Sequence, residues 1–122
     1  MSYVVNIRTE IRDTQALRAA CHRLGLAEPV HETVRLFNAE AAGYAVRLPE
    51  WRYPVVCQLE TGTLAYDNFA GRWGNEQELD RLRQSYAVEK ARIESHKQGH
   101  QITETRLADG AVKLTIQIGG AA

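Results

Sequence analysis

The sequence predicts an α+β protein in which a single antiparallel sheet carries two helices on one face. Three patterns lead to this expectation: short runs in which apolar and polar residues alternate, two stretches with a helical spacing of apolar residues, and tight turns between successive strands. Tight turns join antiparallel neighbours, so the expected element order is β-α-β-β-β-β-α-β-β. With 122 residues the chain has the size of one domain. We expect that α+β domain to span residues 1–118, followed by a flexible C-terminal tail at 119–122.

The N-terminal segment predicts a strand and then a short helix. Apolar residues or Thr occupy the odd positions from Tyr3 to Ile11, which is the period of a strand with one buried face. Asp13 can accept hydrogen bonds from the free amides that begin the next helix. Gly25 is expected to end that helix, because glycine enters the left-handed conformation without a steric penalty.

The middle of the chain predicts four strands joined by short connections. They are expected at residues 30–36, 44–48, 55–60 and 63–67. The connection at 49–54 holds two large aromatic residues, Trp51 and Tyr53, between prolines.

A long helix is expected from Asn75, as its N-cap, to Gln98, a length of about 36 Å at 1.5 Å per residue. Leu79, Leu82 and Tyr86 begin one apolar stripe along it. Lys90 interrupts this stripe, so we expect the second half of the helix to be less firmly buried than the first.

The last structured element should be a hairpin over residues 102–108 and 111–118. Its turn, Asp109-Gly110, is the dipeptide that favours a type I′ turn, in which both central residues have positive φ. The buried face of the hairpin is expected to consist of Val112, Leu114, Ile116 and Ile118.

Charge and composition argue against several classes of protein. Fifteen basic and fifteen acidic residues give a formal net charge of zero without runs of one sign, so nucleic-acid binding is not expected. No apolar run reaches the roughly 18 residues of a membrane helix, and no signal peptide is expected; we predict a cytoplasmic protein. Cys21 and Cys57 fall on predicted buried faces and are interpreted as small buried apolar residues, with a disulfide or a reactive thiol as the alternative.

The motifs of common enzymes are missing from the sequence. It has no phosphate-binding loop and no recognisable nucleophile-histidine-acid order, so we name no catalytic residue and expect no cofactor. Whether the protein is an enzyme stays open, with a non-enzymatic role favoured. His96 and His100 have a spacing that could chelate a divalent metal if Glu104 added a third ligand. The alternative is two exposed histidines that suit the negative end of the helix dipole.

Aromatic and arginine residues give a second candidate site, because Trp, Tyr and Arg are enriched at binding hot spots. Trp51, Arg52 and Tyr53 lie in one predicted loop, and Arg72 and Trp73 precede the long helix. For Trp73 ordinary core packing at the helix entry is the favoured interpretation, and for Trp51 core packing and partner contact are equal alternatives. Val88 and Ala91 lie away from the apolar stripe of the long helix and, with Ala87, predict a small surface patch that could seat another chain.

Several segments of the chain resemble the hypothetical chloroplast open reading frame family, also called domain of unknown function twelve fifty-seven. They are Arg72-Trp73-Gly74, Gln84-Ser85-Tyr86-Ala87-Val88-Glu89-Lys90, Lys97-Gln98-Gly99, Asp109-Gly110 and the N-terminal Thr9-Glu10-Ile11-Arg12-Asp13. The match is good over residues 72–118 and poor over 30–70. Members usually begin Met-Ser-His-Phe, whereas this chain has Tyr3-Val4, so no role of that histidine is carried over.

The resemblance implies an uncharacterised protein of algal plastids, cyanobacteria and other bacteria, without an established activity. Members are often encoded beside an AAA-type ATPase, which implies an accessory role with the ATPase as a partner. The first hypothesis is therefore a non-enzymatic protein-interaction or regulatory accessory domain. The alternative is a small-ligand or metal-binding domain. The sequence leaves the oligomeric state open, a homo-oligomer included.

Overall fold

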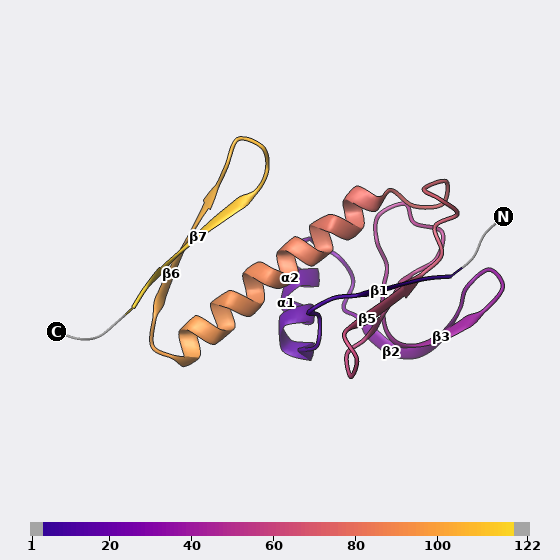
Figure 1. The fold of residues 1–122 in the computed structure, drawn as a ribbon, viewed down its shortest axis with the longest axis horizontal. Coiled ribbons are helices and arrows are strands. Elements are labelled where there is room, and N and C mark those ends of the chain that lie inside the picture. The colour runs from indigo at the N-terminus through magenta and orange to yellow at the C-terminus, as the bar shows by residue number, and fades with distance from the viewer. Residues whose placement is uncertain (1–3, 119–122) are drawn as a thin grey trace.

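A computed structural model of the protein describes residues 4–118 and confirms the α+β class. Within these residues the elements follow the predicted order (Figure 1). They are β1 (Val5–Arg8), α1 (Thr14–Arg23), β2 (Val30–Arg35), β3 (Glu40–Val46), β4 (Val55–Gln58), β5 (Thr63–Tyr66), α2 (Glu76–Lys97), β6 (Gln101–Arg106) and β7 (Val112–Gln117). The tail expected at 119–122 lies outside the described residues.

Five strands form the main sheet, in the order β1-β5-β4-β3-β2 with every pair antiparallel. β1 pairs with β5, with Val5 opposite Tyr66, so the first and fifth strands are neighbours in the sheet although three other strands lie between them in the sequence. Both helices bury their apolar stripes on one face of this sheet, as predicted. That core includes Leu17 and Cys21 of α1, Leu82 and Tyr86 of α2, and Val55, Cys57 and Leu64 of the sheet.

A smaller core occupies the opposite face of the sheet. It contains Val34, Leu36, Ala45, Val56 and Ala65, with Tyr53 packed against it. Alternation along β4 sends Val55 and Cys57 to the helical side and Val56 to the other side. β4 is therefore buried on both faces.

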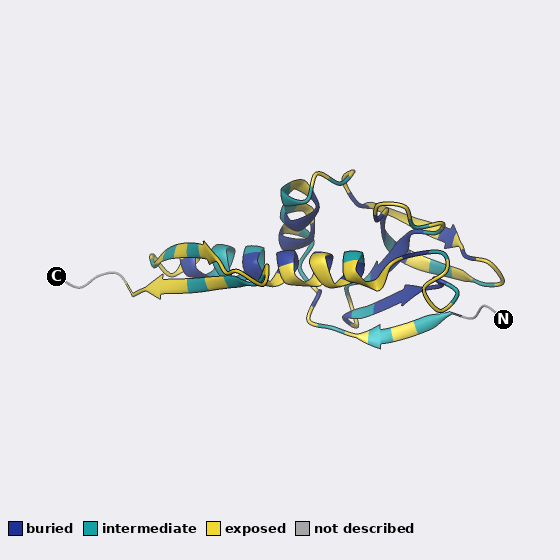
Figure 2. Cartoon of the chain, turned by 90° about the horizontal axis from the view of Figure 1, so that it is seen from above, coloured by how far each residue is buried: buried dark blue, intermediate teal, exposed yellow. Residues whose placement is uncertain are grey.

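The expectation of a single sheet is wrong, because β6 and β7 form a separate two-stranded sheet. The 22 residues of α2 carry the chain about 33 Å, past the edge of the five-stranded sheet. The hairpin and the second half of α2 consequently extend away from that sheet (Figure 2). The hairpin folds back along α2 instead of joining the edge at β1 or β2.

The turn of this hairpin also differs from the prediction. Gly110 has φ +88°, but Asp109 does not have positive φ, so the turn is not type I′. The Leu107 amide donates to the Ala111 carbonyl at 2.8 Å, and the Gly110 amide donates to the Leu107 carbonyl at 3.0 Å. These bonds enclose a three-residue loop with its left-handed residue at Gly110, the second most common hairpin connection.

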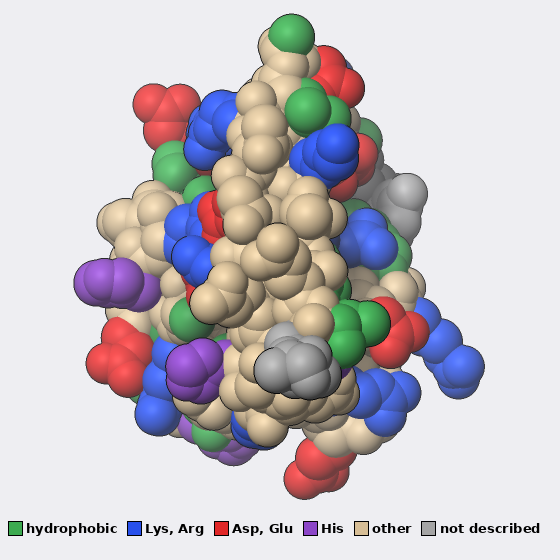
Figure 3. Space-filling view, turned by 90° about the vertical axis from the view of Figure 1, so that its left-hand side faces the viewer, with side chains coloured by type: hydrophobic (Ala, Val, Ile, Leu, Met, Phe, Trp, Pro, Cys, Tyr) green, Lys and Arg blue, Asp and Glu red, His purple; other side chains and the backbone are tan. Residues whose placement is uncertain are grey.

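The half-buried face of the hairpin, which packs on α2, consists of Ile102, Glu104, Val112 and Leu114. The apolar residues at the end of β7 are not buried by this contact. Ile116 is 48% exposed and Ile118 is 80% exposed, so the predicted burial of these two residues is wrong. On α2 the small residues Ser85 and Ser95 are buried. The opposite face of the hairpin consists of Thr, Gln and Lys, and the hairpin end of the molecule is dominated by uncharged polar side chains and backbone (Figure 3).

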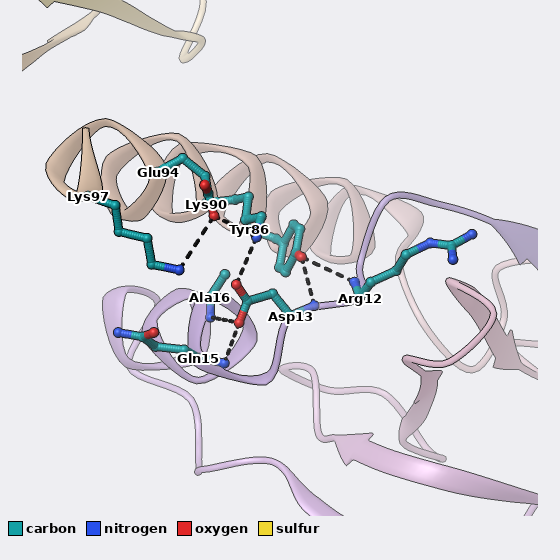
Figure 4. Close-up of polar contacts among 8 residues, drawn as sticks. All are labelled: Arg12, Asp13, Gln15, Ala16, Tyr86, Lys90, Glu94 and Lys97. Atoms are coloured by element: carbon teal, nitrogen blue, oxygen red, sulfur yellow. Dashed lines mark hydrogen bonds and ion pairs between the residues drawn. The ribbon is translucent and has the colours of Figure 1, made fainter. Parts of the chain in front are cut away.

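Lys90, which interrupts the apolar stripe of α2, has a specific partner on α1. Its Nζ donates to Asp13 Oδ2 at 2.8 Å and to Glu94 Oε1 at 3.0 Å (Figure 4). Asp13 Oδ1 caps α1 by accepting from the Gln15 and Ala16 amides. The Lys90 ammonium holds the pKa of Asp13 below its ordinary value, and the amide hydrogen bonds add to this effect.

Tyr86 reinforces the same contact between the two helices. Its Oη accepts from the backbone amides of Arg12 at 3.1 Å and Asp13 at 3.0 Å. Arg12 and Asp13, which lead into α1, are thus bound by two side chains one helical turn apart on α2. The second half of α2 is fastened by polar contacts where the sequence shows a break in its apolar stripe.

Cys21 and Cys57 are free thiols in the core on the helical face, as in the favoured interpretation. Burial raises the pKa of Cys21 to about 11 and, with the neighbouring Cys21, that of Cys57 to about 12. Within residues 4–118 neither helix combines the length and the hydropathy that crossing a bilayer requires.

Candidate functional site

An aromatic cluster surrounds Trp73 at the beginning of the long helix. The Trp73 ring is stacked on Phe69 with centroids 4.7 Å apart, and it meets Phe37 at 5.3 Å and Tyr53 at 5.8 Å. The Arg52 guanidinium lies over Trp73 with Cζ 4.6 Å from the ring centroid, and that of Arg72 lies 5.3 Å from the Phe69 ring. We call these residues the Trp73 cluster: Phe37, Arg52, Tyr53, Phe69, Arg72 and Trp73.

Three connections supply the cluster. Phe37 lies in the β2–β3 turn, Arg52 and Tyr53 in the β3–β4 loop, and the remaining three in the β5–α2 loop. The two loops are tied together because the Arg52 amide donates to the Trp73 carbonyl at 2.8 Å. The Trp73 amide in turn donates to the Asn68 carbonyl at 2.9 Å. Backbone hydrogen bonds therefore hold the β3–β4 loop against the β5–α2 loop, although the two loops are far apart in the sequence.

The β5–α2 loop adopts a strained backbone beneath these rings. Phe69 and Ala70 have φ of 48° and 52°, a left-handed conformation that costs a non-glycine residue roughly 1–2 kcal/mol. Such conformations persist where the surroundings enforce them, and they are found most often at functional sites. The enforcing contacts here come from Asp67 and Asn68, which precede the strained pair.

Asp67 is 1% exposed, and its Oδ1 accepts from the Phe69 amide at 3.1 Å. Its Oδ2 has no hydrogen-bond partner in the described part of the chain. Asn68 is also buried and donates from Nδ2 to the Gly74 carbonyl at 3.2 Å. A buried carboxylate oxygen without a partner is unfavourable, so this loop holds its shape at a cost in stability.

Of the predicted binding residues, the structure brings Arg52, Tyr53, Arg72 and Trp73 together. Trp51 lies outside this cluster and has a structural role instead. Its indole Nε1 donates to the Asn75 carbonyl at 3.0 Å, and its ring meets Tyr66 at 5.6 Å and packs against the core on the helical face. Trp51 therefore fastens the beginning of α2, which matches the core-packing alternative.

Two members of the cluster were not anticipated from the sequence. Phe37 is 51% exposed and follows a predicted strand, while Phe69 is half-buried in a turn. An exposed aromatic residue at a turn is a weak signal by itself. It gains weight here because both rings lie against Trp73.

The expected surface patch at Val88 and Ala91 does not form. Val88 is 4% exposed, because the hairpin lies over this side of α2, and Ala91 is half-buried. Val88 borders the same cavity as Arg106 and Val112 of the hairpin. The apolar residues opposite the main stripe mark a second buried face within the chain, so Val88 is unavailable to a partner in this conformation.

His96 and His100 lie at the end of α2, as predicted, but without a third metal ligand. Within residues 4–118 no group of three or more His, Cys, Asp or Glu side chains could hold a metal ion. Glu104 accepts a hydrogen bond from Arg23 and forms an ion pair with Arg92. The carboxylate that the metal hypothesis requires is thus engaged by two arginines.

Fold and site together define a small α+β protein with an aromatic and arginine surface at one end. Comparisons with known proteins add no family to this description: no family model matches the chain, and no curated protein or solved structure shows significant similarity to it. The resemblance to the chloroplast open reading frame family stays a prediction.

Proposed function

We propose that this protein is a non-enzymatic interaction or regulatory accessory domain that binds a protein partner through the Trp73 cluster. One observation carries the proposal. Four aromatic rings and two guanidinium groups from three separate connections converge around Trp73. Large aromatic residues and arginine are the residues most enriched at binding hot spots.

The arrangement suits binding because it is already ordered. Ring stacking and the hydrogen bonds between the Arg52, Trp73 and Asn68 backbones hold the surface before a partner arrives. Less conformational entropy is then lost on association. Phe37 offers an apolar contact, and the two guanidinium groups offer donors to partner carbonyl or carboxylate oxygens.

An AAA-type ATPase is the first partner to examine, on the strength of the family resemblance. We further propose that the protein works in the cytoplasm. The balanced charge and the two free thiols are compatible with that reducing compartment.

The experiment compares two exposed apolar side chains by titration calorimetry against the purified ATPase. Phe37→Ala removes the most exposed ring of the cluster, whereas Val30→Ala removes a side chain that is 56% exposed on β2 outside it. We expect Phe37→Ala to weaken binding at least tenfold, as hot-spot residues do, and Val30→Ala to have no effect. Equal affinities for Phe37→Ala and the unaltered protein would refute the role of the cluster.

A further inference from the structure

A second cavity lies at the other end of α2, where the helix meets β6. Its volume is about 630 Å³, within the range of roughly 300–1,000 Å³ typical of small-molecule sites. Four basic or imidazole side chains line it: Arg92, His96, Lys97 and His100. Ile93 and Ile102 provide an apolar wall.

The charges that line this cavity have one sign, since no Asp or Glu among residues 4–118 borders it. The carboxylates that pair with Arg92 and Lys97 are shared with other cations. Glu104 lies 3.1 Å from Arg92 and also pairs with Arg23, and Glu94 lies 3.8 Å from Lys97 and 3.0 Å from Lys90. Arg92 and Lys97 therefore each have only part of a neutralising partner.

The larger cavity of about 880 Å³ under the hairpin tip provides a contrast. Its wall carries Arg23, Arg81 and Arg106 but also Glu78, Asp80 and Asp109, so it favours no charge. Of these two cavities, only the one at the end of α2 has a lining that favours anions. On the hairpin end of the molecule, histidine side chains lie beside Lys and Arg side chains, with Asp or Glu side chains nearby (Figure 3).

We infer that the cavity at the end of α2 binds a small organic anion, a carboxylate or phosphate group on a compact apolar body. Arg92 and Lys97 would pair with the acid group, and the imidazole N–H groups of His96 and His100 would donate to its oxygens. The apolar body would lie against Ile93 and Ile102. A divalent metal suits this cavity poorly, because the same two cations repel it.

The test uses calorimetry at low salt with phenyl phosphate and benzoate as probes, and neutral benzyl alcohol for comparison. We expect saturable binding of at least one anion, with the tighter of the two identifying the acid group, and no binding of benzyl alcohol. Lys97→Gln should weaken binding of the anion about fivefold, the effect of losing one solvent-exposed charge contact. The matched control is Lys113→Gln, on the outer face of the hairpin, which should leave affinity unchanged.

Two results would overturn the inference. One is an equal loss of affinity in Lys97→Gln and Lys113→Gln, which would reveal attraction by overall charge. The other is the absence of saturable binding of either anion; saturable zinc binding that His96→Ala abolishes would then identify a metal site instead. Lys97 is exposed, so its substitution should leave the thermal midpoint unchanged, and this is checked first. The Trp73 cluster is at the opposite end of α2, so either proposal can fail alone.

Discussion

Gly74 is the position where the structure makes the sharpest prediction, because the Trp51 indole lies directly on it. A Cβ at residue 74 would lie 2.5 Å from Trp51 Cε2 and 2.7 Å from Cγ, whereas ordinary contact begins at 3.4 Å. The backbone of Gly74 does not have positive φ, so the obstacle is this close approach and not the conformation. In Gly74→Ala the indole must therefore move by about 1 Å.

The free energy of this displacement can be assembled from its parts. Forcing an extra methyl group into a packed site costs about 1–3 kcal/mol. The shift also breaks the hydrogen bond from Trp51 Nε1 to the Asn75 carbonyl, worth about 0.5–1.5 kcal/mol. Alanine returns up to about 1 kcal/mol by restricting the unfolded chain. We expect Gly74→Ala to lower the free energy of unfolding by about 2–3 kcal/mol, measured by urea denaturation.

A double-mutant cycle with Trp51→Ala tests the stated cause. Once the indole is gone, Gly74→Ala should be neutral or stabilising by up to about 1 kcal/mol. The loss in the unaltered background should also be accompanied by a change in tryptophan fluorescence, because the Trp51 environment changes. If Gly74→Ala destabilises the protein equally with and without Trp51, the steric explanation is wrong.

The remaining predictions concern the helical face of the core. The pKa of Asp13 is lowered in the folded protein, chiefly by Lys90, so the stability that this shift supplies is present above the ordinary Asp pKa of about 3.9 and is lost as the pH falls through the folded value. Lys90→Met should therefore cost about 0.5–1 kcal/mol at pH 7. It should also flatten the loss of stability that begins below about pH 5 and continues as the pH falls through the folded pKa of Asp13. Denaturation at each pH measures both effects, and an unchanged pH profile would contradict them. Cys21 and Cys57, with pKa values raised to about 11 and about 12, should react with Ellman's reagent at neutral pH only after unfolding in urea, and fast labelling of the folded protein would contradict their burial.

The order of the elements could be predicted from the sequence because each element leaves a local signal. The caps Asp13 and Asn75, and Gly25 with φ +71°, are confirmed. The assignment of the hairpin to the main sheet failed because a strand pattern shows that a strand exists and not which edge it joins. Only the length of α2 indicated that the hairpin lies apart from the main sheet, since a helix of 22 residues takes the chain beyond the edge of that sheet.

The candidate site was predictable in part for the same reason. Trp, Tyr and Arg are enriched at binding hot spots, so Arg52, Tyr53, Arg72 and Trp73 could be named from their residue type and their places next to predicted elements. Their meeting with Phe37 and Phe69 depends on long-range backbone hydrogen bonds and on a left-handed turn at residues that are not glycine. No propensity rule predicts such a turn.

Two apparent irregularities of α2 acquire a common physical explanation. Val88 lies off the apolar stripe because this helix has a second buried face, and Lys90 lies on the stripe because Asp13 of α1 is its partner. A helix packed on one side only would need neither residue. α2 is held instead between α1 and the hairpin, so its ends lie beside different partners: the loops of the sheet at Trp73, and α1 with β6 at His100. The two proposed binding surfaces occupy these ends, where side chains of separate elements converge: aromatic rings and guanidinium groups around Trp73, and the lining of a cavity at His100.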